Sequence, residues 1–353
     1  MAVRIMIMAG GTGGHVFPGL AVAQYLTDAG HTVSWLGTKK GIEGKLIPEA
    51  GLAIDWLDVT GLRGKGLMRT FVAPLMLLKA CWQASTIIRQ RKPDVVLGFG
   101  GFASGPGGLM SWVHRKPLVI HEQNRVPGTT NRLLKTLATK VLEAFPKSFS
   151  ADVNAICTGN PLRGTLIGKS EAKQQHGGNI LVLGGSLGAA VLNEVVPKAL
   201  TTVQKGIDVR VIHQAGEKTL ELAKQSYKDA GVEADVLSFI DDMKKVYSWA
   251  DIVICRAGAM TISEVAVMGV PSILVPLPSA IDDHQTKNAE YLAEQGAALL
   301  MPQKKLTAAL LAEQLIELLE KPNKLTEMSG KALALSMPEA TKLVANQCLE
   351  VAL

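Results

Sequence analysis

A glycine-rich turn near the N-terminus constrains the fold of this chain more than any other segment. Residues 3–8 form an apolar run that predicts a buried parallel strand, and the run leads into the sequence GGTGGH at residues 10–15. The following helix is expected to begin near Pro18, because proline is favoured in a first helical turn. Glycines at such a turn bring backbone N–H groups to the positive end of a helix dipole without side chains in the way. The turn therefore predicts an α/β fold and an anion-binding site.

The turn also carries an ionisable side chain. Its spacing fits neither the dinucleotide fingerprint nor a Walker loop with its lysine, but it places His15 at the mouth of the turn. An imidazole titrates near neutral pH, and a helix N-terminus favours the neutral form that a general base needs. His15 is therefore a candidate general base. The alternative is a structural turn with an incidental histidine.

Strand-like and helix-like segments alternate along the chain. In the first half, strand-like runs at 32–37, 53–57, 93–98 and 116–120 are separated by helical patterns at 42–50 and 67–91. The pattern starts again at 179–183, with further strand-like runs at 209–213, 235–240, 251–255 and 271–275. This alternation predicts parallel sheets with right-handed crossovers. We expect two doubly wound domains, residues 1–159 and 160–337, with a ligand between them and a final amphipathic helix at 338–353.

Polar and glycine-rich segments mark further candidate sites. Residues 121–124 read HEQN at the end of an apolar run, where four polar side chains are costly unless they face a ligand or bond one another. Glycine turns recur at 99–106 and 184–188, and residues 256–264 again read as strand, turn and helix start. In the last of these, Thr261 and Glu264 have the spacing of a capping box, which explains both residues without a ligand.

Composition excludes several classes of protein. With 353 residues and 47% hydrophobic content, the chain is long enough for two cores. The four cysteines form no CxxC pair, so we expect reduced thiols and no metal site. Aromatic residues at 5% and a net charge of +6 do not fit a nucleic-acid partner. No signal peptide is expected, and the longest apolar stretch, residues 70–78, is too short to cross a bilayer.

The helical pattern at 67–91 is apolar on one side and basic around it. Leu67, Phe71, Leu75, Leu78 and Trp82 recur at helical spacing, with lysines and arginines on both flanks. One interpretation is a core-facing helix with solvated basic ends. The other is a surface that rests on a membrane with negative headgroups.

Taken together and in this order, the motifs resemble the MurG family of glycosyltransferases. The resemblance covers the whole chain and rests on GGTGGH at 10–15, GLRGKG at 61–66, HEQN at 121–124, GGS at 184–186, FIDDM at 239–243, and residues 100–106, 159–163 and 256–264. It implies the GT-B fold, two Rossmann-like domains that face across a cleft, with the C-terminal helix crossing back to the first. It also implies transfer of N-acetylglucosamine from UDP-N-acetylglucosamine to the 4-hydroxyl of the muramyl sugar of lipid I, with inversion, without a cofactor and without an obligatory metal.

The resemblance also implies roles for individual residues. His15 is the proposed base, Glu122 lies on the acceptor side, and Asn124 contacts the donor sugar. Arg163 and Ser186 contact the nucleotide and its phosphates, and the backbone of Ile240 reads uracil. The remaining substrate contacts are Thr12, Gly13 and Gly14 at the sugars, Ala259, Met260, Thr261, Ile262 and Ser263 at the diphosphate, Glu264 at the ribose and Gln285 at a sugar hydroxyl.

The apolar and basic surface matches the family's proposed membrane-docking face. Its residues are Phe71, Leu75, Leu78, Trp82 and Trp112. The resemblance thus implies a peripheral protein on the cytoplasmic face of the bacterial inner membrane, with other cell-wall synthesis or division proteins as further partners. Three positions depart from the family pattern: Phe102 stands where tyrosine occurs, Leu187 where glutamine is common and His284 where some relatives have a second glutamine.

Two other functions fit the same architecture. A UDP-N-acetylglucosamine 2-epimerase would use the same nucleotide site but would need no lipid-facing surface. A non-catalytic scaffold would bind the UDP-sugar and recruit cell-wall synthesis proteins.

Overall fold

The chain divides into two units of similar size. The computed structural model describes residues 2–59, 67–166, 177–185 and 188–352, with the backbone alone at 67–73 and at 281. Contacts group Met1–Gly164 with Met337–Leu353 as the first unit, and Thr165–Ser336 form the second. We expect the boundaries after residues 159 and 337, whereas the first unit extends to Gly164 and resumes at Met337. Arg163, which the expected boundary assigns to the second domain, therefore belongs to the first unit.

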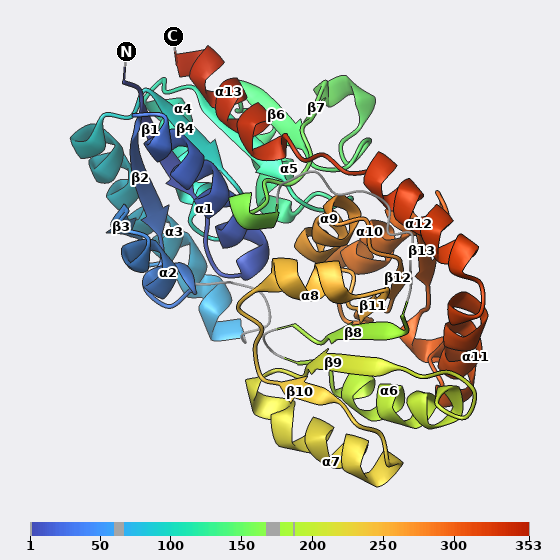
Figure 1. Cartoon of the computed structure of the whole chain (residues 1–353). Helices are drawn as coiled ribbons and strands as arrows, with labels where there is room; N and C mark the ends of the chain where they lie inside the picture. The colour runs from blue at the N-terminus through green and yellow to red at the C-terminus, as the bar shows by residue number, and fades with distance from the viewer. Residues whose placement is uncertain (1, 60–66, 167–176, 186–187, 353) are drawn as a thin grey trace. The chain divides into compact units, whose positions relative to one another are not determined.

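The described residues of the first unit form a parallel sheet of seven strands in the order β3-β2-β1-β4-β5-β6-β7 (Figure 1). The strands are β1 (Arg4–Met8), β2 (Thr32–Gly37), β3 (Ala53–Trp56), β4 (Val95–Gly98), β5 (Leu118–Glu122), β6 (Lys140–Glu143) and β7 (Ile156–Cys157). The helices are α1 (Gly13–Asp28), α2 (Glu43–Glu49), α3 (Leu67–Arg91), α4 (Ser104–Val113), α5 (Thr129–Leu134) and α13 (Ala340–Ala352). The order reverses between β1 and β4, where doubly wound sheets bind ligands.

Alternating side chains of β1 supply two separate cores. Ile5 and Ile7 pack on one face of the sheet, in the cluster that contains Val22 of α1 and Val344 of α13. Met6 and Met8 pack on the opposite face with Ala84 and Ile88 of α3. Both faces are therefore apolar, as expected for a parallel sheet covered on each side by helices.

The second unit repeats the design. Its described residues form a parallel sheet of six strands in the order β10-β9-β8-β11-β12-β13. The strands are β8 (Asn179–Leu183), β9 (Arg210–Gln214), β10 (Asp235–Leu237), β11 (Ile252–Cys255), β12 (Ser272–Leu274) and β13 (Ala298–Leu300). The helices are α6 (Ala190–Val203), α7 (Leu220–Ala230), α8 (Met243–Trp249), α9 (Ala259–Val267), α10 (His284–Ala293), α11 (Ala308–Leu319) and α12 (Pro322–Ala334). Here the order reverses between β8 and β11.

Helix α1 begins earlier than predicted. We expected its start near Pro18, but the helix begins at Gly13 and Pro18 lies inside it. The reason is that the carbonyl of Thr12 accepts hydrogen bonds from the backbone N–H groups of His15 and Val16, at 3.1 Å each, so the glycine turn already forms the first helical turn. His15 is therefore a helix residue, held by α1 itself.

The C-terminal helix α13 belongs to the first unit. Val344, Ala345 and Cys348 are fully buried in the same cluster as Val22 of α1, and Figure 1 shows α13 beside α1. The Nζ atom of Lys140 on β6 lies 2.7 Å from a carboxylate oxygen of Glu350 and donates a bond of 2.7 Å to Gln347. The last helix is thus a structural part of the first unit.

Candidate functional site

In the first unit, two glycine loops touch at the point where the strand order reverses. One loop follows β1 and the other follows the neighbouring strand β4. A Cβ atom on Gly101 would collide with the carbonyl of Gly10, and both Gly11 and Gly101 have positive φ angles, of 92° and 81°. Glycine is required at this contact because any side chain would separate the loops. The loops also join through Ser104, whose hydroxyl donates to the carbonyls of Met8 and Gly100 at 2.9 and 2.7 Å.

His15 lies between these two loops. Its Nδ1 atom is 3.0 Å from the hydroxyl oxygen of Thr12, and a Cβ atom on Gly100 would lie 3.3 Å from its Nε2 atom. If Nδ1–H donates to Thr12, the lone pair of the imidazole is on Nε2, on the side of the second loop. In that tautomer Nε2 is the basic atom of the ring.

A guanidinium group lies beside the N-terminal turn of α1. The Cζ atom of Arg163 is 4.3 Å from the centre of the Phe17 ring, a cation–π contact. A Cβ atom on Gly13 would lie 2.9 Å from the same ring, so the ring packs against the glycine turn. Arg163 is exposed and adds a positive charge next to the helix N-terminus of the first unit.

Three of the four residues in HEQN are buried in a hydrogen-bond network. His121 Nε2 donates to the carbonyl of Gly159 at 2.9 Å, and Nδ1 accepts a bond of 3.0 Å from the Gln123 amide. Burial lowers the pKa of His121 to about 4, so the ring is neutral at pH 7. The side chains of His121, Glu122 and Gln123 are at most 2% exposed. These three residues thus bond the surrounding protein, as in the alternative of a buried hydrogen-bond network.

The carboxylate of Glu122 is already occupied. Oε1 accepts from the backbone N–H and the amide of Asn124 at 3.0 and 3.2 Å, and Oε2 accepts from the N–H of Gly128 and the amide of Asn131, both at 2.9 Å. In this structure the four donors hold the carboxylate of Glu122 so that it positions Asn124, which is half-buried, and the start of α5. A catalytic role of Glu122 on the acceptor side, which the resemblance implies, stays a prediction.

In the second unit, helix N-termini follow the two strands at the reversal point. β8 leads to Gly184 and Gly185 ahead of α6, and β11 leads to α9. Ser186, predicted to contact phosphate, lies outside the described residues. Helix α9 starts at Ala259 with Gly258 as its N-cap, and no described side chain caps it. The capping-box prediction is wrong, because Thr261 and Glu264 lie inside the helix. The first turn, which contains Ala259, Met260, Thr261 and Ile262, is suited to an anion such as a diphosphate.

Glu264 is held by a tyrosine that the sequence reading did not single out. The hydroxyl of Tyr247 on α8 donates to Oε2 of Glu264 at 3.0 Å. Burial, followed by the charge of Glu264, raises the pKa of Tyr247 well above its usual value, so it stays a donor. The same two causes raise the pKa of Cys255 to about 12. Tyr247 thus holds the side chain of Glu264, which is half-buried.

The other predicted contacts of the second unit have structural partners. Ile240 is buried, just before Asp242, which caps α8 by accepting from the N–H of Lys245 at 3.0 Å. Gln285 Oε1 accepts from the backbone N–H of Leu277 at 3.0 Å and so holds the loop after β12 against α10. Ser263 donates to the carbonyl of Ala259 at 3.0 Å. Only the bond of Gln285 orders a loop, whereas the bonds of Asp242 and Ser263 lie in the first turns of α8 and α9.

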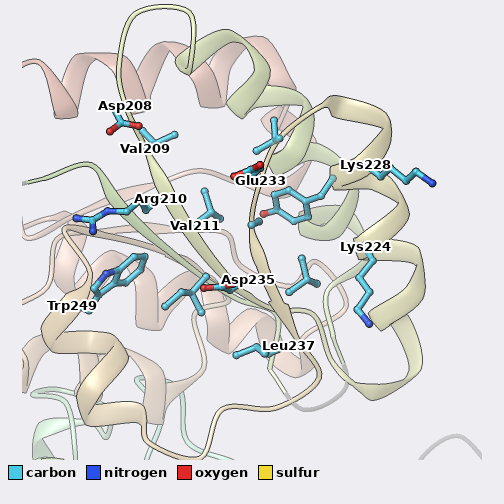
Figure 2. A pocket seen from close by; sticks show the side chains of 15 residues that line it. Asp208, Val209, Arg210, Val211, Lys224, Lys228, Glu233, Asp235, Leu237 and Trp249 are labelled. Carbon is cyan, nitrogen blue, oxygen red and sulfur yellow. The ribbon is translucent and has the colours of Figure 1, made fainter.

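A groove of about 1050 Å³ lies elsewhere in the second unit, along β9 and β10 (Figure 2). Asp208 and Glu233 line it near the beginnings of these strands, and Lys224 and Lys228 of α7 line it as well. The glycine turns follow the opposite, carboxyl ends of β8 and β11. We therefore assign the groove no part in the candidate site.

Helices α3 and α4 expose large apolar side chains. Leu75, Leu78 and Trp82 of α3 are 67%, 66% and 69% exposed, and Trp112 of α4 is 53% exposed. The other side of α3 buries Ala84 and Ile88, so the helix is both core-facing and surface-forming. The side chain of Phe71 lies outside the described residues. No described helix is both long and apolar enough to span a bilayer, and the described His, Cys, Asp and Glu side chains form no group of three that could hold a metal.

Two family models match most of the chain. The glycosyltransferase family 28 N-terminal domain matches residues 5–143, and the glycosyltransferase family 28 C-terminal domain matches residues 179–344. The chain therefore belongs to glycosyltransferase family 28.

Full-length relatives narrow the resemblance to MurG. A Methylococcus capsulatus protein named UDP-N-acetylglucosamine–N-acetylmuramyl-(pentapeptide) pyrophosphoryl-undecaprenol N-acetylglucosamine transferase is 54% identical over 100% of this chain and 99% of its own length. A protein of Stutzerimonas stutzeri with the same name is 52% identical with the same coverage. The crystal structure of Acinetobacter baumannii MurG is 42% identical, with a TM-score of 0.85 over 99% of each chain. The expected resemblance and the expected GT-B type of fold are confirmed.

Proposed function

We propose that this protein transfers N-acetylglucosamine from UDP-N-acetylglucosamine to the 4-hydroxyl of the muramyl sugar of lipid I, with inversion, to give lipid II. The observation that carries the proposal is the identity of 54% to a transferase of this name over the full chain. The geometry supports it. A histidine beside two glycine loops suits proton removal from an acceptor hydroxyl, and the N-terminus of α9, with Gly258 as its N-cap, suits the charge of a leaving diphosphate.

In the proposed reaction His15 takes the proton of the acceptor hydroxyl. The hydroxyl oxygen attacks the anomeric carbon, the bond from this carbon to the diphosphate breaks, and UDP leaves with the electron pair. Thr12, Gly13 and Gly14 line the reacting sugars. The helix N-terminus at residues 259–263 stabilises the negative charge that develops on the diphosphate.

The remaining contacts bind the donor. Glu264, held by Tyr247, accepts hydrogen bonds from the ribose hydroxyls, and the backbone of Ile240 reads uracil. Gln285 and Asn124 bond the sugar. Arg163 and Ser186 bind the nucleotide and its phosphates.

We also propose that the apolar surface of α3 and α4 docks on an anionic membrane at its cytoplasmic face. Its support is the exposure of Leu75, Leu78, Trp82 and Trp112, together with the lysine and arginines in the sequence of α3. An enzyme with a lipid-linked acceptor must bind that acceptor at the bilayer surface. Contacts with other cell-wall synthesis or division proteins stay a prediction without an assigned surface.

Release of UDP tests the proposal against its two rivals. UDP-N-acetylglucosamine is incubated with the protein, with and without a lipid I analogue, and both UDP and the sugar nucleotide are quantified. Release only with acceptor supports transfer. Conversion of the donor to its 2-epimer without acceptor would support an epimerase; a putative UDP-N-acetylglucosamine 2-epimerase from Listeria monocytogenes, 15% identical with a TM-score of 0.69, shares the fold alone. Binding without either product would support a scaffold.

A further inference from the structure

The buried carboxylate of Glu43 bonds the backbone of the glycine loop that follows β1. Glu43 is the first residue of α2, and its side chain is 0% exposed. Its Oε2 atom accepts from the backbone N–H of Gly11 at 3.0 Å. Its Oε1 atom accepts from the N–H and the hydroxyl of Thr38 at 3.1 and 2.7 Å. One carboxylate therefore joins the loop after β1 to the loop after β2.

The surrounding backbone leaves room for this carboxylate and little else. A Cβ atom on Gly10 would lie 2.5 Å from Oε1 of Glu43, one on Gly37 would lie 3.0 Å from its Cγ atom, and one on Gly41 would collide with the carboxylate. A buried carboxylate is retained only where donors satisfy it. Three donors and three glycines thus enclose one side chain, and we call this site the Glu43 socket.

The Glu43 socket holds the backbone just before His15, the proposed base, through the hydrogen bond to Gly11. Gly11 has a φ angle of 92°, and the bond to its N–H fixes the peptide plane that enters the turn. The next residue, Thr12, contacts His15 through its side chain at 3.0 Å and begins α1 through its carbonyl. A shift at Gly11 would therefore move both members of the Thr12–His15 pair.

We propose that Glu43 is a positioning residue for sugar transfer, which sets the place of His15 by holding the N–H of Gly11. The inference rests on the proposed function, in which His15 is the base. It explains an acidic residue that sequence reasoning passes over, because a glutamate at a helix start is ordinarily a solvated partner of the helix dipole.

The test compares Glu43→Gln with the unaltered chain. The amide keeps the size of the side chain but sets an NH₂ group against one set of donors, at Gly11 or at Thr38. We expect kcat with a lipid I analogue to fall about 10- to 100-fold, because small displacements of a catalytic group have effects of this size. We expect KM for UDP-N-acetylglucosamine to change less than about twofold, because the proposed nucleotide contacts lie mainly in the second unit.

A matched control and a local probe separate positioning from general damage. Glu49→Gln changes an exposed glutamate of the same helix and should leave both constants unaltered. In folded Glu43→Gln, amide hydrogen exchange should accelerate in residues 9–15 and not in the second unit. Thr38→Val removes one donor and keeps the bond to Gly11, so kcat should fall less, about two- to fivefold.

Different results would contradict the positioning role of Glu43 and the proposed sugar transfer on which it rests. If the unaltered chain releases no UDP with acceptor, the proposed function fails. If it does release UDP and Glu43→Gln keeps full kcat, or loses donor binding with unchanged kcat, Glu43 does not position the base. Should Glu43→Gln not fold, the Thr38→Val result decides, and full kcat there would count against the inference.

Discussion

At the scale of single residues, the side chain with the most specific proposed role is His15. We expect His15→Ala to lower turnover with acceptor about 10²- to 10⁴-fold, because a general base typically contributes this much. Affinity for UDP-N-acetylglucosamine should change little, since the base acts on the acceptor. Steady-state transfer and calorimetric donor binding measure the two quantities separately.

A second histidine provides the control for this substitution. His31 accepts from the N–H of Val3 at 3.1 Å, at the beginning of β1 and so at the opposite end of the strand from the glycine turn. His31→Ala should keep turnover within about twofold. Full turnover in His15→Ala would remove His15 from the mechanism.

Burial of His121 predicts an acid-sensitive first unit. The folded pKa of about 4 lies below the ordinary value near 6.5, so between these pH values the unfolded chain binds a proton that the folded unit does not. Stability is then complete above pH 6.5 and falls as the pH drops through this window, by about 2 kcal/mol at pH 5. Urea unfolding at pH 7 and pH 5, read by hydrogen exchange in β5, measures the loss. The same loss in His121→Gln would show that another group is responsible.

At the scale of elements, strands and glycine turns were predictable where one local pattern decided them. The run at 179–183 coincides with β8, and the helix at 67–91 with α3, because a short apolar run and a long amphipathic period leave few alternatives. A hydrogen-bond network at residues 121–124 was one of two predicted alternatives, but its partner outside the motif was not predictable, because the carbonyl of Gly159 lies 38 residues away in sequence from His121. The roles of Glu43 and Tyr247 were not predicted for the same reason, because their hydrogen-bond partners belong to other elements.

The exposed side of α3 gives a prediction for this element. Leu78→Asp combined with Trp82→Asp should lower binding to phosphatidylglycerol-rich vesicles at least about tenfold, because it removes two large apolar contacts and adds negative charge. Vesicle sedimentation measures the bound fraction. Turnover with a water-soluble acceptor analogue should stay within about twofold, because neither residue is part of the proposed site.

An exposed leucine of the second unit is the control for that surface. Leu222 of α7 is 54% exposed, and Leu222→Asp should leave vesicle binding unchanged. Equal binding by the α3 variant and the unaltered chain would show that the membrane is met by another surface.

For the molecule as a whole, the last segment, Met337–Leu353, belongs to the first unit although it follows the second in sequence. The stability of the first unit should therefore depend on α13. Val344 of α13 is fully buried among residues of β1 and α1, so Val344→Asp places an unpaired charge in that core and should destabilise it by on the order of 4 kcal/mol. Leu343, its neighbour, is 38% exposed, and Leu343→Asp should cost less than about 1 kcal/mol. Hydrogen exchange resolved by segment should show the Val344→Asp loss in β1 and β4, with β8 and β11 unaffected. Equal acceleration in both sheets would mean that the last helix stabilises the two units together instead of the first alone.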